Sequence, residues 1–299
     1  MIILVILCAL TLHQYREEIK GIDYYSFFIQ KPNITYEFIN EKDGGNLKFE
    51  PQISSFSGLA VGTEHLDITL AFKQQEEHEV KESQALDLQF SGLWKSYYWD
   101  LYYQNYQGLY LKDEESELIL QERRSNAYSY GLGFKYFFNE NYNPKKSLAS
   151  HKKFNERKTA WSWLAGAFYN KNQLISHNQS FIPRSAQDDF SRINGLKSFT
   201  SDNYGIEYGI AGMYLWGNFH FSGLLSASNM LQYHEYSGID EHRETRSSTG
   251  NYGFIDFGYS TQNKTFGING LTQNISSEIT STQLNQSRTI GQFYYKYFF

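Results

Sequence analysis

His220 and Ser222 are the two residues whose types and spacing come closest to a catalytic pair in this sequence. A histidine can act as the base that activates a serine nucleophile, and residues two apart on a β-strand point to the same face. Asn229 lies downstream as a candidate third member that would orient the histidine, but its position has the opposite parity. Phe219 and Phe221 form an apolar face that alternates with the pair. The pattern therefore favours polar wall residues over a catalytic dyad.

The histidines and acids form no recognised metal-binding motif. No HxxxH or HExxH pair occurs among the eight histidines. His234 and His242 flank an acidic segment with Glu235, Asp240, Glu241 and Glu244, which could hold a divalent cation, although a solvated surface loop is the favoured interpretation. A P-loop, a dinucleotide fingerprint and a nucleophile elbow are also missing from the sequence. We therefore expect no metal and no cofactor, and the balance leans against an enzyme.

The composition points to an all-β protein. Aromatic residues make up 18% of the 299 residues, yet the mean hydropathy is −0.56, which excludes a bundle of membrane helices. A net charge of −5 provides no basic surface for nucleic acid, so no nucleic-acid partner is expected. A single cysteine excludes a disulfide framework.

Alternation of apolar and polar residues with period two runs from Asn33 through most of the chain, and helical periodicity is almost absent. The pattern predicts about twelve strands, several of them longer than the roughly 5 to 6 residues typical of soluble proteins. The predicted strands cover residues 33–40, 46–61, 65–73, 84–94, 96–111, 125–138, 157–172, 202–216, 218–234, 246–260, 264–274 and 288–299.

The connections between these strands alternate in length. Tight turns are expected at 62–64, 95, 217–218 and 261–263, and long polar loops at 74–83, 112–124, 173–201, 235–245 and 275–287. Short turns on one side and long loops on the other are typical of a transmembrane antiparallel β-barrel, with the short turns in the periplasm. One connection, 139–156, is long where a short turn belongs and is interpreted as a periplasmic excursion or a miscounted strand.

Parity assigns the charged strand residues to the lumen, because a Lys or Arg facing lipid costs roughly 2–4 kcal/mol near the midplane. The predicted lumen-lining residues are Glu37, Lys48, Glu50, Asp67, Lys73, Asp87, Asp100, Lys135, Glu207, Asp256, Arg288 and Lys296. All five tryptophans fall at the expected periplasmic ends of their strands, where aromatic rings collect at the membrane interface. They are Trp94, Trp99, Trp161, Trp163 and Trp216.

The last nine residues, GQFYYKYFF, place Phe293, Tyr295, Tyr297 and Phe299 at alternate positions. This segment resembles the C-terminal signal of Gram-negative outer-membrane β-barrels. The resemblance implies an outer-membrane location, contact with outer-membrane lipid, and recognition of the C-terminal strand by the barrel-assembly machinery. Two further stretches, LKFEPQISSFSGLAVG from Leu47 and FNERKTAWSWLAGAFY from Phe154, are similar to domain-of-unknown-function family 4421, which implies no particular activity.

Three segments are expected along the chain. Residues 1–12 form an apolar stretch that is too short to cross a bilayer as a helix and matches the apolar part of a secretory signal. Residues 13–32 are expected to be an N-terminal periplasmic extension, and residues 33–299 the outer-membrane barrel.

Three functions are compatible with such a barrel. The first is a narrow passive channel for small solutes or ions, which the polar inward face favours. The second is a lipid hydrolase that uses His220 and Ser222, since outer-membrane phospholipases and lipid A deacylases carry a histidine and a serine two apart on one strand. The third is a structural or surface-interaction barrel with a filled lumen.

Overall fold

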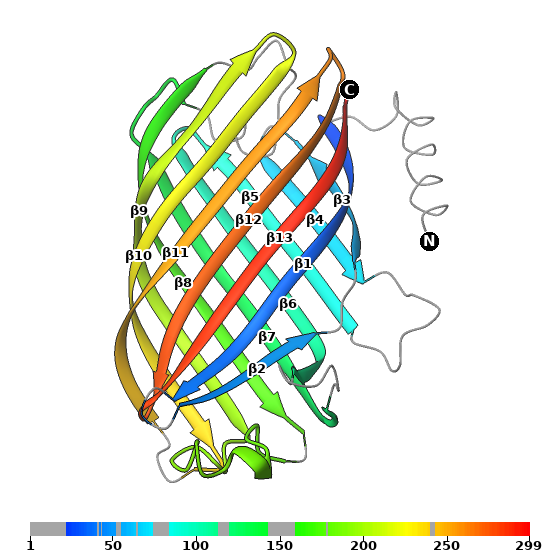
Figure 1. The fold of residues 1–299 in the computed structure, drawn as a ribbon. Coiled ribbons are helices and arrows are strands. Elements are labelled where there is room, and N and C mark those ends of the chain that lie inside the picture. Colours follow the sequence, from blue (N-terminus) through cyan, green and yellow to red (C-terminus); the bar gives the residue numbers. More distant parts are fainter. Residues whose placement is uncertain are drawn as a thin grey trace.

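The alternating pattern produces strands of 7 to 19 residues in a computed structural model of the chain (Figure 1). The structure describes residues 22–40, 42, 44–51, 55–63, 65–73, 84–112, 120–142, 159–177, 179–239 and 243–299. The strands are β1 (Tyr24–Asn40), β2 (Gly45–Pro51), β3 (Phe56–Gly62), β4 (Leu66–Lys73), β5 (Gln84–Trp94), β6 (Tyr97–Lys112), β7 (Leu120–Phe137), β8 (Ala160–Ser176), β9 (Ser198–Trp216), β10 (Phe219–Ser237), β11 (Arg243–Ser260), β12 (Lys264–Ile279) and β13 (Thr282–Phe298). A single turn of 3-10 helix covers Arg184–Ala186. No helix in the described part of the chain is long and apolar enough to cross a membrane.

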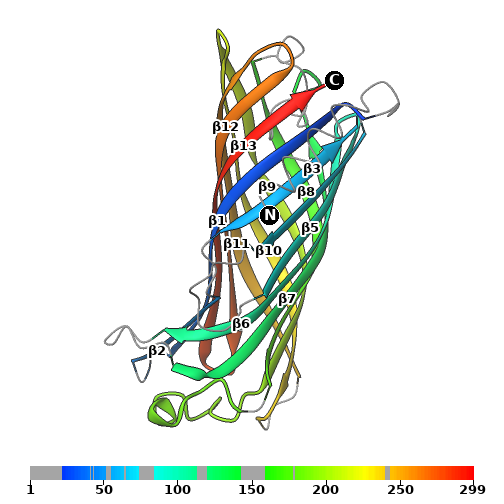
Figure 2. The same ribbon diagram turned by 90° about the vertical axis from the view of Figure 1, so that its right-hand side faces the viewer.

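The strands close into a twelve-stranded antiparallel barrel. Closure comes from β13 and β1, which pair from Tyr24↔Phe298 to Ile39↔Gln283 and lie side by side in Figures 1 and 2. β3 pairs with the first half of β1 and β2 with its second half, so these two short strands share one position in the wall. Beyond the β4–β5 hairpin, β2 pairs directly with β6.

The wall contains more of the chain than the sequence pattern predicted. β1 begins at Tyr24, so residues 24–32, which were expected in a periplasmic extension, form the first half of a barrel strand. β12 and β13 continue to a tight turn at residues 280–281, where a loop over 275–287 was expected. Both added stretches keep period-two alternation. In 275–287 the outer face carries Ser276, Asn285 and Ser287, and such polar residues are typical of a loop in the sequence. Residues 1–12, 74–83 and most of 139–156 lie outside the described residues.

The outer face of the wall carries an apolar band. On β9 the exposed large side chains occupy alternate positions, namely Tyr204, Ile206, Tyr208, Ile210, Tyr214 and Trp216. The twelve residue-to-residue steps from Tyr204 to Trp216 rise by about 30 Å at roughly 3.3 Å per residue and a tilt near 40°, close to the ~25 Å band of outer-membrane barrels. The band therefore has the height that a bilayer requires.

Aromatic rings mark both edges of this band. Trp94, Trp161, Trp163 and Trp216 are exposed near the end where β1 begins and β13 ends, and Trp99 is half-buried there over Gly92. At the opposite edge, Tyr169, Tyr204 and Tyr233 pack in a row, with ring centroids 5.0 and 5.9 Å apart. We call the tryptophan end the periplasmic end, following the rule that short turns face the periplasm, and the other end the outer end.

Candidate functional site

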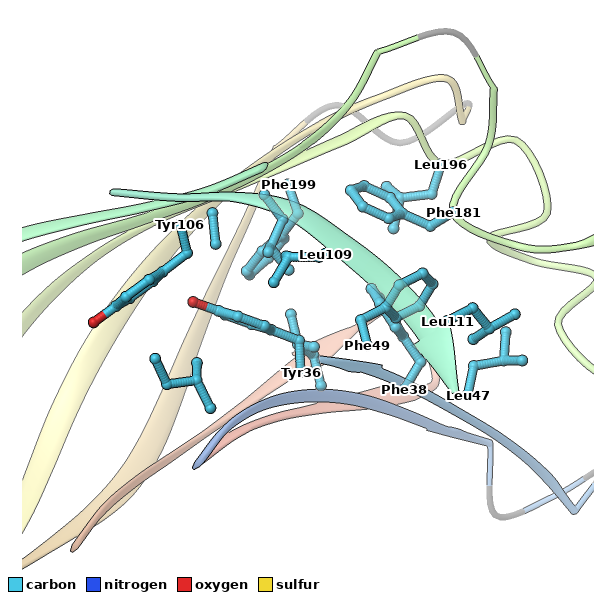
Figure 3. Close-up of a cluster of buried hydrophobic side chains, with 14 of the residues drawn as sticks. Tyr36, Phe38, Leu47, Phe49, Tyr106, Leu109, Leu111, Phe181, Leu196 and Phe199 are labelled. Carbon is cyan, nitrogen blue, oxygen red and sulfur yellow. The ribbon is translucent and has the colours of Figure 1, made fainter. Parts of the chain in front are cut away.

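The lumen is filled at its outer end by a cluster of buried apolar side chains, which we call the plug (Figure 3). Phe38 of β1, Phe49 of β2 and Phe181 of the β8–β9 connection pack with ring centroids 5.8 to 5.9 Å apart. Each of the three rings is at most 2% exposed. The plug also contains Tyr36, Leu47, Tyr106, Leu109, Leu111, Leu196 and Phe199, contributed by β1, β2, β6, β9 and the same connection.

The connection between β8 and β9 folds over the outer end of the barrel. A loop over 173–201 was expected to be long and polar, but Ile182, Phe190, Ile193 and Leu196 are buried and belong to the plug. The segment closes on itself through a bond from the Phe181 N–H to the Leu196 carbonyl at 2.8 Å. Polar residues such as Arg184 and Arg192 stay exposed on its outer side. Most residues of this connection are polar, so the sequence pattern predicted a polar loop although its few apolar residues are buried in the plug.

A bulge in β6 orients two of the plug residues. The register with β7 shifts between Gln107 and Leu109, and Gly108 takes a φ of 76°, a left-handed conformation that glycine adopts without strain. Beyond the bulge, Leu109 and Leu111 are buried among the plug residues. Period-two alternation through this point therefore assigns the wrong face to the end of β6.

Three of the predicted lumen residues lie on the outer face instead. Because Phe38, Leu47 and Phe49 occupy the plug, the alternating Glu37, Lys48 and Glu50 face outward. Lys48 pairs with Glu50 at 2.6 Å, and Glu37 accepts a bond from Asn46 at 2.9 Å. The error at Lys48 and Glu50 has a structural cause: one strand was expected over 46–61, but β2 ends at Pro51 and β3 begins at Phe56 with its parity reversed.

Between the plug and the periplasmic end the lumen holds a cavity of about 320 Å³ lined by charged, polar and aromatic side chains, which we call the chamber. Of the predicted lumen residues, seven line it: Asp67, Asp87, Asp100, Lys135, Glu207, Arg288 and Lys296. Lys135 lies 3.0 Å from Glu207 and 3.7 Å from Asp100, and Arg288 of β13 bonds Asp87 of β5 across the lumen. Lys73 is half-buried at the end of β4, opposite Phe56.

Glycines make these contacts possible. Lys135, Gly166 and Glu207 are neighbours in one row across β7, β8 and β9, so the lysine reaches the carboxylate over a position without a side chain. A Cβ at Gly166 would lie 2.5 Å from the Phe134 carbonyl oxygen and 3.3 Å from the Lys135 Cγ. In the same wall, the ring of Tyr102 lies over Gly131 and that of Phe168 over Gly205. The glycines hollow the inner wall and turn aromatic faces toward the chamber.

His220 and Ser222 lie on the inner wall near the periplasmic end and are both at most 1% exposed. The His220 Nε2 lies 2.9 Å from Asp256 Oδ2, and Ser222 donates to that same oxygen at 3.5 Å. Tyr294 of β13 donates to the other Asp256 oxygen at 2.9 Å. The serine is thus directed at the aspartate and not at the histidine.

Asp256 is the partner that the sequence reasoning missed, because nothing in the sequence shows that it lies opposite Ser222 in the β10–β11 register. Asn229, the candidate third member, lies on the outer face and bonds the Tyr208 hydroxyl at 3.5 Å. The cluster is assembled over Gly258 and Gly267, which separate His220 and Tyr294 in one row across β10 to β13.

Neither a metal centre nor a cation loop is formed by the described residues. They contain no group of three His, Cys, Asp or Glu side chains that could hold a metal. At the predicted acidic loop, Glu235 pairs with Arg243, and Glu244 with Arg246. Residues 240–242 lie outside the description.

The sequence profile of the domain of unknown function DUF4421 matches residues 19–299. No protein with a curated description matches the chain. Among solved structures, the outer membrane protease OmpT from Escherichia coli is similar at 11% identity, covering 94% of this chain and 97% of the other, with a TM-score of 0.43. The translocator domain of autotransporter NalP from Neisseria meningitidis is 7% identical, with 99% of this chain and 96% of the other covered and a TM-score of 0.33. The toluene transporter TodX from Pseudomonas putida is 8% identical, with 94% of this chain and 91% of the other covered and a TM-score of 0.32. These likenesses concern the fold alone.

Proposed function

Because the chain belongs to the DUF4421 family and is a β-barrel of the bacterial outer membrane, we propose that it acts as a surface-interaction barrel with a closed outer end. The outer face contacts membrane lipid, as the fold requires. The folded β8–β9 connection then forms an ordered surface above the membrane for a binding partner.

The plug is the observation that carries this proposal. An apolar constriction in a pore excludes water and ions, because dewetting makes their passage unfavourable. Phe38, Phe49 and Phe181 come from three different segments and leave little exposed surface, so together they close the lumen from opposite sides. The charged side chains of the chamber also support a closed barrel, since Lys135 and Arg288 are already paired with carboxylates.

A gated channel for small solutes or ions is the second candidate. The polar chamber supports it, because a barrel that only anchors a surface has no need of a hollowed inner wall. In this reading the plug is the gate, and solutes pass only when the β8–β9 connection moves away.

A lipid hydrolase is not favoured. The Ser222 hydroxyl donates to Asp256, so the histidine is not placed to take its proton. Both residues are buried inside the wall, away from the lipid on the outer face. We expect Ser222→Ala to leave any fatty-acid release from phospholipid vesicles unchanged.

The barrel-assembly machinery is the proposed partner during insertion. Phe293 and Tyr295 face outward on β13, where Phe293 is 71% exposed, and β13 closes the barrel against β1. We expect deletion of Phe299 to reduce assembly into the membrane, measured as the heat-modifiable folded band on a gel.

Conductance in a planar lipid bilayer tests the proposal. The wild-type protein should give no steady conductance in potassium chloride, whereas a variant with residues 179–196 replaced by a short Gly-Ser linker should conduct. A matched control with substitutions only at the exposed Arg184 and Arg192 should remain closed. Steady wild-type conductance would reject the closed barrel in favour of an open channel.

A further inference from the structure

The chamber has features of a ligand site that the closed-barrel function does not use. Its volume of about 320 Å³ lies at the lower limit of small-molecule pockets, roughly 300–1,000 Å³. The lining reaches Tyr24, Asp67 and Ser91, which lie close to the periplasmic turns. The plug blocks the opposite direction. The chamber therefore extends from the plug toward the periplasmic end.

Three glutamines of the lining have side-chain amides without a partner among the described residues. Gln30, Gln89 and Gln273 line the chamber, and no side-chain hydrogen bond joins them to another described residue. Gln30 is only 7% exposed and still faces the cavity. Buried polar groups in proteins are nearly always hydrogen-bonded to protein, water or a ligand. Each amide offers donors and an acceptor to the occupant of the chamber.

Most charged side chains of the lining form ion pairs with one another. Lys135 pairs with Glu207 and Asp100, and Arg288 with Asp87. A charged ligand would have to break one of these pairs and leave the released partner in a desolvated site, which is costly. The chamber therefore discriminates in favour of a neutral ligand.

The aromatic side chains add flat apolar faces to this polar lining. Tyr102 and Phe168 lie along the wall over Gly131 and Gly205, and both line the chamber. Stacking on such faces suits a ligand that has an apolar ring face and hydroxyl groups around its edge. Free amides and paired carboxylates supply the hydrogen bonds to those hydroxyls.

We propose that the chamber binds a neutral mono- or disaccharide. The aromatic faces of Tyr102 and Phe168 stack on the sugar ring, and the amides of Gln30, Gln89 and Gln273 bond its hydroxyls. The same site would serve a closed or a gated barrel, so its occupancy is independent of conductance.

Calorimetry on the full-length protein in detergent micelles tests this proposal. The titrants are glucose, maltose and sucrose, with glucuronate and glucosamine as charged analogues of a similar shape. At least one neutral sugar should bind, and the charged analogues at least tenfold more weakly. Absence of binding by all three neutral sugars at millimolar concentration, or preference for a charged analogue, would overturn the proposal.

Matched variants locate the site. Gln89→Ala should weaken binding about two- to tenfold, the value expected for one neutral hydrogen bond, whereas Gln84→Ala on the opposite face of β5 should change nothing. Tyr102→Ala should weaken binding more than Gln89→Ala, with Tyr103→Ala on the lipid face as its control. Because no side-chain hydrogen bond joins either glutamine to another described residue, both of those variants should fold. Equal weakening by a chamber variant and its control would place binding elsewhere.

Discussion

Replacing Phe38 by alanine should both destabilise the barrel and weaken its closure. Phe38 is fully buried, and its ring contacts those of Phe49 and Phe181 at 5.8 and 5.9 Å. A buried Phe→Ala change costs about 3–5 kcal/mol through lost transfer free energy and the cavity left behind. Two lost ring pairs, each worth roughly 0.5–1.5 kcal/mol, place the expected loss toward the upper half of that range.

The free energy of unfolding in urea, followed by the folded band on a gel and by tryptophan fluorescence, measures this cost. The neighbouring Ile39→Ala is the matched control, since Ile39 is half-buried on the opposite face of β1. It should cost less than about 1.5 kcal/mol, because little of its surface contacts a packed core. In planar bilayers Phe38→Ala should also show brief openings that the control lacks. A loss below about 1 kcal/mol for Phe38→Ala would refute the packed plug on which the closed barrel depends.

Three further outcomes are expected. Lys135→Met should cost about 3–5 kcal/mol in the same urea assay, because it leaves two carboxylates without their cation; a neutral effect would mean that the chamber solvates them freely. Leu225→Arg, on the lipid face of β10, should cost roughly 2–4 kcal/mol in lipid vesicles and less in detergent. Trypsin added to intact cells should cleave at Arg184 or Arg192 and spare Lys95, and cleavage at Lys95 alone would reverse the orientation.

The sequence alone determined the barrel, because its evidence is local. Period-two alternation needs only neighbouring residues, so β4 and β5 were predicted within a residue of their observed bounds. The lipid band follows from the same parity, and the tryptophans at strand ends follow from the preference of their rings for the membrane interface. Where the chain keeps this period without interruption, as at Asp87, Lys135 and Arg288, parity also placed the chamber charges inside.

The tertiary structure decided everything that depends on register, breaks in period or contacts across the lumen. Lys48 and Glu50 face outward because the wall strand breaks after Pro51, and Leu109 turns into the plug because a bulge at Gly108 shifts the register. Asp256 meets His220 only through the pairing of β10 with β11. The plug itself joins residues more than a hundred positions apart, such as Phe38 and Phe181. No local pattern encodes such a contact, because it exists only after the barrel has closed and brought opposite walls together.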